Sequence, residues 1–440
     1  MSSTQLKNNF MRLNILIKIL LPAIIPSLTV SAQLHQLNLQ QAYNLARENY
    51  PLIQEKSLLD KSSFITIENI KTAYLPQVSI NGQASYQSDV TSLSSVINLS
   101  TIFPGLTIPS MSKDQYKFVA DVNQLIYDGG TTKAQKEIQQ KNNLVNQQQI
   151  EVELYKLKDR INQLYLGILL LNEQLKQNLL ARENVNIGLK TVTAQVENGT
   201  AYRSAALVLE AQLLQYDQND IVIKANKDQL VKVMELFIHQ HLSDDVQLQT
   251  PVVTETLDDE IIRPEMKLYN FQDSLLQSQQ LLIKSKNIPK LSLFGEGGYG
   301  KPGLNMLQNS FRLYGLGGIK LSWNLSNFYT SKHDKEIINV NQKINQVQRD
   351  VFIFNTNTQL IQQQKEIERL KQLIAVDEKL IDVRKTITDA SKAQLQNGVI
   401  SSNDYLREVN NEDQTHQSLI LHQIQLLQAQ INYQNIKGNQ

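Results

Sequence analysis

Apolar and polar residues alternate with a period of two in four short segments of the chain. The first two segments are residues 77–86 and 116–126, and the other two are residues 291–299 and 313–323. A period of two with one apolar side is typical of a β-strand that buries one face. The positions on the predicted apolar faces are Val78, Ile80, Gly82, Ala84, Tyr86, Tyr116, Phe118, Ala120, Val122, Ile126, Leu291, Leu293, Gly295, Gly297, Tyr299, Leu313, Ile319, Leu321 and Trp323.

Two other segments have a helical pattern of unusual length. Residues 131–196 contain no proline, and residues 330–396 contain neither proline nor glycine. Each would extend about 95 to 100 Å as one helix, at about 1.5 Å per residue. Helices of this length do not fit inside a compact globule, so we expect them to run beside other helices. A narrow apolar stripe with spacings of three and four residues supports this: Leu154, Leu157, Ile161, Leu164, Ile168 and Leu171.

The chain repeats its own pattern. "LPQVSINGQASY" begins at residue 75 and "IPKLSLFGEGGY" begins at residue 288. The spacing between Pro76 and Pro289 is also the spacing between Pro51 and Pro264. Such shared spacings predict an internal duplication. Each copy is expected to read helix, strand, loop, strand, long helix, glycine turn and helix.

The duplication predicts a division of the chain into segments. Residues 33–50 form an N-terminal helical segment, and residues 242–263 link the two copies. The first copy covers residues 51–241 and the second covers residues 264–440.

Residues 1–32 have the features of a secretory signal peptide. Basic residues precede the apolar run 19–30, and the ending "VSA" predicts cleavage before Gln33. The alternative is a membrane anchor helix. The run is short, however, and Pro22 and Pro26 interrupt it, whereas a spanning helix needs about 20 apolar residues. We therefore expect an exported protein without a helical membrane span.

The amino-acid composition argues against several classes of function. The chain has 43 Lys and Arg against 42 Asp and Glu, so its bulk charge does not indicate a nucleic-acid partner. It has no cysteine, which excludes disulfides, thiolate metal sites and a cysteine nucleophile.

Amphipathic strands on an exported chain raise a problem of closure. A membrane strand has about 9 to 11 residues, and open sheet edges do not occur in hydrocarbon. Four strands are too few to close a barrel, because the smallest known membrane barrels have about eight. Several chains must therefore contribute, and three chains would give twelve strands and a wider interior than two. The alternative is a soluble sheet whose apolar face packs on helices.

The order and spacing of these features resemble the TolC-type outer membrane efflux protein family. The features are the signal peptide, the paired proline and strand motifs, "QLIYDGGTTKAQ" from residue 124, and "NGT" and "NGV" between long helices. The resemblance implies a mixed α/β membrane protein in the outer membrane. Three chains would form a twelve-stranded β-barrel that continues into an α-helical tunnel across the periplasm. Residues 33–50, residues 242–263 and the C-terminus would supply an equatorial belt around the tunnel.

The resemblance also implies a function and partners. The homotrimer would conduct substrate from an inner-membrane pump and a periplasmic adaptor (membrane fusion) protein to the outside, and the barrel would contact outer membrane lipid. No cofactor, metal or nucleic acid is expected. The residues expected to face lipid are Val78, Ile80, Tyr86, Phe118, Val122, Leu291, Leu293, Tyr299, Leu321 and Trp323.

The glycine turns are the expected periplasmic tips, where a left-handed residue ends one helix before the next. Gly199 would mark the first tip and Gly398 the second. The resemblance assigns Asp404 to an acidic position, and three copies would form a ring that favours cations. Alternatively, Asp404 only begins a helix, where a carboxylate is favourable.

The second tip departs from the family pattern. Arg407 occupies a position that is often acidic, and the first tip has Ala205 where an aspartate is expected. Tyr202, Arg203, Asp404 and Arg407 could instead form a different latch between the tips.

Other signals are weak. "GEGGYGKP" at residues 295–302 approaches a phosphate-binding loop but has Pro302 in place of Ser or Thr. His239 and His241 form a close pair without carboxylates at ligand spacing. No catalytic motif is present, so we expect no enzyme. The competing interpretation is an exported coiled-coil protein without a transport role, such as a periplasmic adaptor.

Overall fold

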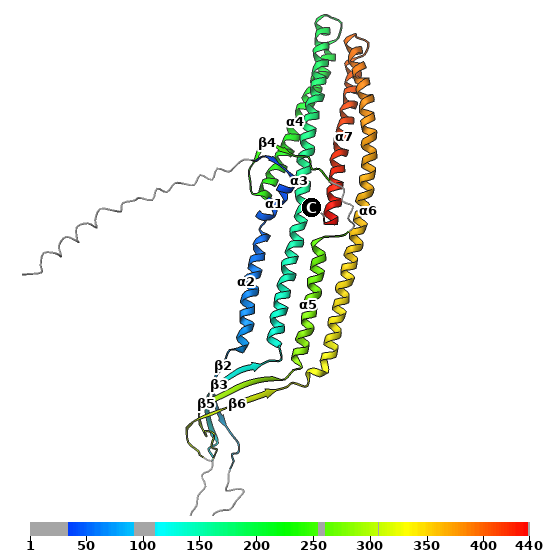
Figure 1. Ribbon diagram of the computed structural model, residues 1–440. Coiled ribbons are helices and arrows are strands. Elements are labelled where there is room, and N and C mark those ends of the chain that lie inside the picture. The colour runs from blue at the N-terminus through cyan, green and yellow to red at the C-terminus, as the bar shows by residue number, and fades with distance from the viewer. Residues whose placement is uncertain (1–33, 92–110, 254–259, 307, 439–440) are drawn as a thin grey trace, which may run out of the picture.

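The computed structural model describes residues 34–91, 111–253, 260–306 and 308–438, so the predicted signal peptide lies outside the described residues. Long helices run side by side in one direction, and a sheet continues from one end of the helical layer (Figure 1). Within the described ranges, no helix is both long enough and apolar enough to cross a bilayer.

Two helices span most of the length of the helical layer. α3 (Thr131–Glu197) has 67 residues and α6 (Asn327–Gln396) has 70 residues, which confirms the two long helices expected from the sequence. The remaining helices are α1 (Leu39–Asn49), α2 (Leu52–Lys71), α4 (Arg203–Ile238), α5 (Pro264–Lys286), α7 (Ser402–Lys437) and the short 3₁₀ helix η1 (Thr72–Tyr74).

Prolines define the ends of the two helices that approach the sheet. Pro51 is the N-cap of α2, and Pro264 is the first residue of α5. Proline suits a first helical turn because its fixed φ is already close to the helical value. Pro76 and Pro289 each directly precede a strand, where the restriction on the preceding residue prevents further helix. The helices between the paired prolines are therefore confirmed.

The sheet contains the four strands expected from the alternating pattern. All neighbours are antiparallel, and the order β2-β3-β5-β6 leaves β2 and β6 at the two edges. The strands are β2 (Gln77–Tyr86), β3 (Asp114–Tyr127), β5 (Lys290–Lys301) and β6 (Arg312–Ser322).

The register brings the apolar positions of all four strands to one face. Val78 lies opposite Val122 on β3, and further along the sheet Leu293 lies opposite Ile319 on β6. Successive residues of a strand point to opposite faces, so the partners of an apolar position share its face. Trp323 lies one residue beyond the end of β6, and its indole Nε1 donates to the backbone oxygen of Asn287 at 3.0 Å.

A second, smaller sheet lies midway along the helical layer. β1 (Leu34–Leu37) pairs in parallel with β4 (Leu242–Leu248) beside α1 and α3, and we call β1, α1 and β4 the belt (Figure 1). The Tyr165 hydroxyl on α3 joins them, because it lies 2.8 Å from the backbone oxygen of Leu37 and 2.7 Å from that of Gln249, and the two carbonyls share its one proton. Burial raises the pKa of Tyr165 well above its usual value, so the phenol stays protonated as a donor.

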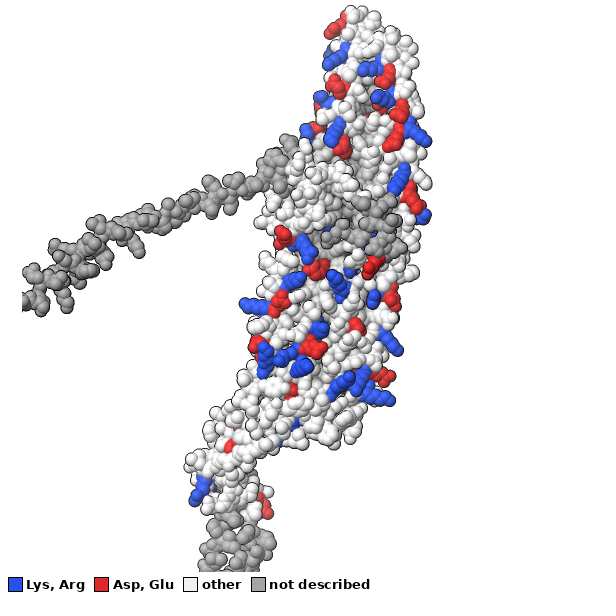
Figure 2. Space-filling view, viewed as in Figure 1, with Lys and Arg blue, Asp and Glu red and all other residues white. Residues whose placement is uncertain are grey.

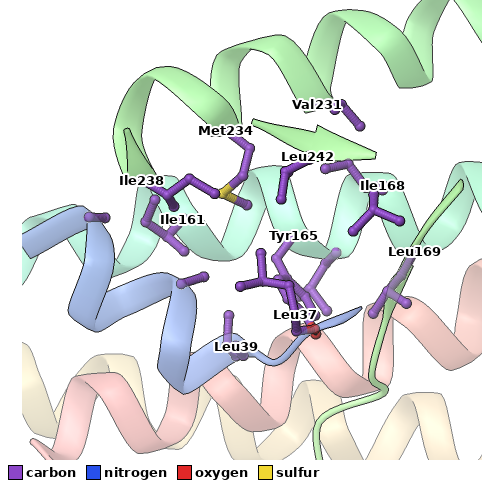
Figure 3. Close-up of a cluster of buried hydrophobic side chains, with 14 of the residues drawn as sticks. Leu37, Leu39, Ile161, Tyr165, Ile168, Leu169, Val231, Met234, Ile238 and Leu242 are labelled. Carbon is purple, nitrogen blue, oxygen red and sulfur yellow. The ribbon is translucent and has the colours of Figure 1, made fainter. Parts of the chain in front are cut away.

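The main hydrophobic core lies between the belt and the middle of α3 (Figure 3). Leu39 and Ala42 of α1 contribute to it, and the end of α4 covers it from the other side. A second cluster lies near the far ends of the helices and joins α3, α4, α6 and α7. The buried residues of the main core that Figure 3 labels are Leu37, Leu39, Ile161, Tyr165, Ile168, Leu169, Val231, Met234, Ile238 and Leu242.

A buried carboxylate holds the junction between β3 and α3. Asp128 is 2% exposed and accepts hydrogen bonds from the backbone nitrogens of Gly130 and Thr132 at 2.8 and 2.6 Å. The Tyr74 hydroxyl at the end of η1 also donates to it, at 2.9 Å. Burial opposes the ionised form, but the hydrogen bonds from Thr132, Tyr74 and Gly130 outweigh burial and lower the pKa of Asp128.

We expect Asp128→Asn to destabilise the protein by about 1 to 3 kcal/mol, because an amide cannot accept from all three donors. The stabilisation should be complete above the ordinary aspartate pKa of 3.8 and should fall as pH drops through the lowered value. Thermal unfolding followed by circular dichroism between pH 7 and pH 3 measures both effects. Asp228→Asn, at an exposed position of α4, is the control. Equal thermal-unfolding midpoints for Asp128→Asn and Asp228→Asn would contradict the stabilising role of the Asp128 carboxylate.

Candidate functional site

The apolar face of the sheet is open to the surroundings of the chain. Val78 and Ile80 are each 66% exposed. No helix of the described chain covers this face, so the arrangement differs from a soluble sheet packed on helices. Of the ten residues predicted to face lipid, Leu291 is half-buried and the other nine are exposed: Val78, Ile80, Tyr86, Phe118, Val122, Leu293, Tyr299, Leu321 and Trp323.

The opposite face of the sheet is polar. Asn81 Nδ2 donates to Asp121 Oδ2 at 2.9 Å, and the Tyr314 hydroxyl donates to Glu296 Oε1 at 3.1 Å. The visible surface over the sheet carries few charges, whereas Lys, Arg, Asp and Glu are scattered along the helices (Figure 2). The sheet therefore has one apolar face and one polar face.

Two glycines on the polar face lie under aromatic rings. The Tyr314 ring occupies the place where a side chain on Gly298 would lie. The Phe294 ring lies 3.1 Å from the position of a Cβ on Gly318. Each ring therefore lies flat on the neighbouring strand.

The helical layer has two different edges. On the sheet side of the belt, α2 packs on α3, α3 on α5 and α5 on α6; on the other side the order is α4, α3, α7 and α6. α6 thus forms one edge throughout, and α2 and α4 form the other (Figure 1).

The α6 edge carries an exposed apolar stripe that the sequence analysis missed. Its first six members, from Ile337 to Phe354, are three or four residues apart, which is the spacing of a helix face that packs on another helix. The signal was present in the sequence, because residues 337–354 keep this spacing without interruption by proline or glycine. The exposed members are Ile337, Val340, Ile344, Val347, Val351, Phe354 and Ile361, followed nearer the tip by Val376, Leu380, Val383 and Ile387.

The opposite edge carries matching apolar residues. On α4, Leu207, Leu214 and Ile221 recur every seven residues and are 49%, 65% and 67% exposed. On α2, Leu58 and Ile65 have the same spacing and are 63% and 49% exposed. Both edges of one chain therefore expose apolar stripes with helical spacing.

The two predicted tips lie together at the end of the helical layer away from the sheet (Figure 1). Gly199 and Gly398 each have φ of +69° and follow the ends of α3 and α6. The left-handed conformation favours glycine and ends the preceding helix.

Asp404 has both features that the sequence left as alternatives. It lies in the first turn of α7 in a capping box: Ser401 Oγ accepts from the Asp404 nitrogen at 3.2 Å, and Asp404 Oδ2 accepts from the Ser401 nitrogen at 3.3 Å and from Ser401 Oγ at 2.7 Å. These hydrogen bonds, from the side chain and then the backbone of Ser401, lower the pKa of Asp404. The carboxylate is also exposed, and Arg407 Nη1 lies 3.5 Å from its Oδ1. Arg407 in turn contacts Glu408 at 3.2 Å, and Arg384 contacts Glu408 at 3.5 Å.

The latch expected between the two tips is not assembled within the described part of one chain. Tyr202 is the N-cap of α4 and is 85% exposed, and Arg203 is the first residue of α4. No hydrogen bond or ion pair among the described residues joins either of them to Asp404 or Arg407. A latch from these side chains therefore needs a neighbouring molecule, and it stays a prediction.

Tyr405 fixes the start of α7 on α3, a contact that the sequence did not reveal. The side chain is 1% exposed, and its hydroxyl donates to the backbone oxygen of Asn184 at 3.0 Å. Its ring lies against Gly188, where an added Cβ would come within 2.5 Å of Tyr405 Cε1. The residue next to Asp404 thus anchors the acidic position to the neighbouring helix.

The discounted signals do not form sites in the described residues. Residues 295–301 belong to β5, which confirms a strand in place of a phosphate-binding loop. His241 Nδ1 lies 2.7 Å from Glu235 Oε1, and His239 ends α4. Within the described ranges, no group of three His, Cys, Asp or Glu residues could hold a metal ion.

Comparison with protein families gives one match. A family model described as outer membrane efflux protein matches residues 42–237. No curated protein sequence matches the chain.

Solved structures share the fold over almost the whole chain. The transmembrane channel CusC is 14% identical with a TM-score of 0.66, over 94% of this chain and 96% of CusC. VceC from Vibrio cholerae is 11% identical with a TM-score of 0.64, over 91% of this chain and 96% of its own. MtrE from Neisseria gonorrhoeae, in its open state, is 13% identical with a TM-score of 0.64, over 91% of this chain and 89% of MtrE.

We expect Gly188→Ala to destabilise the packing of α7 on α3 by about 1 to 3 kcal/mol, because the added methyl overlaps the Tyr405 ring. An alanine inside a helix would otherwise stabilise it by up to about 1 kcal/mol. A thermal-unfolding cycle with Tyr405→Leu measures the coupling. The double variant should lose less unfolding free energy than the two single variants lose together. Strictly additive losses of unfolding free energy would contradict the contact.

Proposed function

We infer that the chain is an outer membrane efflux protein, from the family match over residues 42–237 and from a fold shared with outer membrane channels. It is the channel component of an efflux system, and it is located in the outer membrane. The observation that carries this function is the sheet with one exposed apolar face and one polar face. The helices extend from one end of this sheet, where they would lie in water.

The channel interpretation is better supported than the adaptor interpretation. The matching family model describes efflux proteins of the outer membrane, which are transport components. A periplasmic adaptor would also contain paired helices, but it would not need a sheet with an open apolar face. We propose that the chain works with a periplasmic adaptor and an inner-membrane pump, docked at the tips near Gly199 and Gly398.

We propose that three copies close the structure. In lipid, the free N–H and C=O groups of β2 and β6 need partners, and the edge of another copy can supply them. The two edges differ, so contact between copies is heterologous and must close into a ring. Three copies supply twelve strands and therefore a wider interior than the eight strands of two copies.

The helical stripes support the same assembly. If β6 of one copy pairs with β2 of the next, α6 lies beside α2 and α4 of that neighbour. The exposed stripe on α6 would then cover Leu58 and Ile65 on α2 and Leu207, Leu214 and Ile221 on α4. Burying these side chains contributes about 25 cal/mol for each Å² removed from water.

We also propose that the chain contains an internal duplication. Its two copies would cover residues 51–241 and 264–440, with residues 33–50 before them and residues 242–263 between them. The first half runs α2, β2, β3, α3 and α4, and the second runs α5, β5, β6, α6 and α7, in the same order of element types. Residues 33–50 and 242–263 would form the equatorial belt with the end of α7. Ile262 supports this, because its nitrogen donates to the Lys437 oxygen at 2.9 Å.

At the tips, we propose that Asp404 and Arg407 line the narrowest part of the pathway. The lowered pKa of Asp404 keeps its carboxylate ionised at neutral pH. Arg407 and Arg384 balance much of the charge of Asp404 and Glu408, so the ring should prefer cations only moderately. Tyr202 and Arg203 of a neighbouring copy would complete the latch.

We expect Val347→Glu combined with Val351→Glu to prevent trimer formation, because the interface would bury unpaired carboxylates. Size-exclusion chromatography with light scattering should show at least about a tenfold fall in the trimer-to-monomer ratio. The control is Gln346→Glu with Gln348→Glu, which adds the same charge at exposed positions of the same turns. Equal trimer content in both variants would argue against the α6 edge as the interface.

We expect Asp404→Lys to lower the cation-to-anion permeability ratio by at least about twofold, because it reverses a charge at the constriction. Reversal potentials of the channel in planar bilayers measure the ratio, and export of a fluorescent dye from cells tests transport. Asp228→Lys is the control on the exposed surface of α4. Unchanged conductance, selectivity and export in Asp404→Lys would rule out the gate role.

A further inference from the structure

The start of α6 continues the apolar face of the sheet onto the helical layer. Trp323 lies one residue beyond β6, and its ring meets the Phe328 ring edge to face with 6.4 Å between the centroids. Trp323 and Phe328 are 53% and 51% exposed. Because residues two apart on a strand share a face, Trp323 lies on the same side as the exposed Leu321. The apolar face therefore reaches the first turn of α6 through Phe328.

Two lysines follow Phe328 along the same side of α6. Phe328, Lys332 and Lys335 are four and three residues apart, which places them on one face of the helix. They line a groove of about 600 Å³. The remaining lining residues are Ser331, Glu336 and Asn339. The groove thus has an aromatic end next to the sheet and a basic part beyond it.

Carboxylates do not neutralise these two lysines. Glu336 is the single acid among the residues that line the groove, and neither lysine forms an ion pair within the described part of the chain. Asp334 is half-buried and lies one residue from Lys335 and two from Lys332, so it faces another side of the helix. Two ammonium groups therefore stand against one carboxylate.

The end of the helical layer next to the sheet also has an excess of positive charge. Four segments of eleven residues at the helix ends contain nine Lys against four Asp and Glu, whereas the whole chain has 43 Lys and Arg against 42 Asp and Glu. The segments are residues 65–75, 131–141, 280–290 and 327–337. Basic side chains over this end of the layer are visible in Figure 2. An anion near the groove therefore meets a positive field.

The lysines lie at the depth of lipid headgroups if the apolar face of the sheet lies in hydrocarbon. Tryptophan is enriched where hydrocarbon meets water, and the headgroup layer beyond is about 5 to 8 Å thick. Along α6, Lys332 and Lys335 lie about 6 and 10 Å beyond Phe328. Their side chains lean towards the N-terminus of α6, which is the sheet end. Side chains three residues apart are neighbours, so one phosphate can contact both lysines.

This side of α6 is separate from the proposed contact between copies. The apolar stripe of α6 begins at Ile337, which is two residues from both Lys335 and Asn339 and so lies across the helix from them. The contact with α5 also uses another side, where Asn327 Nδ2 donates to the Lys286 oxygen at 2.7 Å. The groove therefore stays open in the proposed trimer.

We propose that the groove binds the headgroup of an anionic phospholipid in the leaflet that faces the periplasm. The phosphate accepts hydrogen bonds from Lys332 and Lys335, and the acyl chains lie along Phe328, Trp323 and Leu321. A lipid with a net negative charge suits the excess of lysine better than a zwitterionic lipid does. The bound lipid fixes the depth of the trimer in the membrane. The inference rests on the proposed location in the outer membrane and adds a lipid partner to it.

Fluorescence of the full-length trimer in vesicles tests the site, because Trp323 is the single tryptophan of the chain. The vesicles contain equal amounts of phosphatidylglycerol and phosphatidylcholine, and one lipid at a time carries bromine on its acyl chains. Bromine quenches tryptophan only at short range, so quenching measures which lipid lies beside Trp323. We expect phosphatidylglycerol to be preferred at least about threefold over phosphatidylcholine. Raising NaCl from about 0.1 to about 1 M should reduce this preference at least about twofold, because salt screens the lysines.

Variants locate the preference to the groove. Lys332→Gln combined with Lys335→Gln should abolish the preference, and Lys332→Arg combined with Lys335→Arg should retain it because the charge stays. The control is Lys379→Gln with Lys385→Gln, which removes the same charge from exposed positions of α6 about 70 Å farther along the helix. This control should keep the wild-type preference. Light scattering checks that each variant is a trimer.

The outcomes separate the lipid site from the membrane location. Equal quenching by the two lipids would overturn the lipid site and leave the location of the sheet in the membrane intact. A wild-type preference in a folded, trimeric Lys332→Gln and Lys335→Gln variant would do the same. No quenching by either lipid would place Trp323 outside hydrocarbon and would contradict both the lipid site and the proposed location.

Discussion

The hydrogen-bonding requirement of the two edge strands is the constraint on which the architecture depends. β2 and β6 each have one paired side within the chain, and the other side of each strand is open. Water could satisfy these groups in a soluble protein, but hydrocarbon cannot. Because the sheet also exposes an apolar face, the chain is incomplete by itself in a membrane. In the proposed trimer, pairing with other copies would solve both problems at once, since it would join the edges and turn the polar face towards an aqueous interior.

The helical layer, which would lie in water, also has two edges that another copy could cover. Its interior side chains pack within the chain, as the core around Tyr165 and the cluster around Tyr405 show. Its two edges expose stripes with helical spacing on α6 and on α2 and α4. Here the driving force is burial of apolar surface, whereas in the sheet it is backbone pairing. In the proposed trimer, the sheet and the helices would therefore favour the same neighbour through different forces.

The sequence predicted those features that depend on local periodicity and on proline and glycine. The strands, the long helices and the glycine turns belong to this class, since each depends on nearby residues. The stripe on α6 has the same kind of local signal as the stripe of α3 around Ile161, so it too was predictable. The pairing of β1 with β4 could not be predicted, since such short strands carry almost no pattern. The contact of Tyr405 with Gly188 arises only when the distant segments α7 and α3 pack together.

The rings that lie on Gly298 and Gly318 have a consequence for the cross-section of the proposed pore. Phe294 and Tyr314 are the largest aromatic side chains on the polar face of their strands, and ordinary neighbours would force them to project inwards. Because the glycines leave room, each ring lies along the wall and takes up little of the bore. The lumen of the proposed pore would thus gain a partly aromatic lining without losing width.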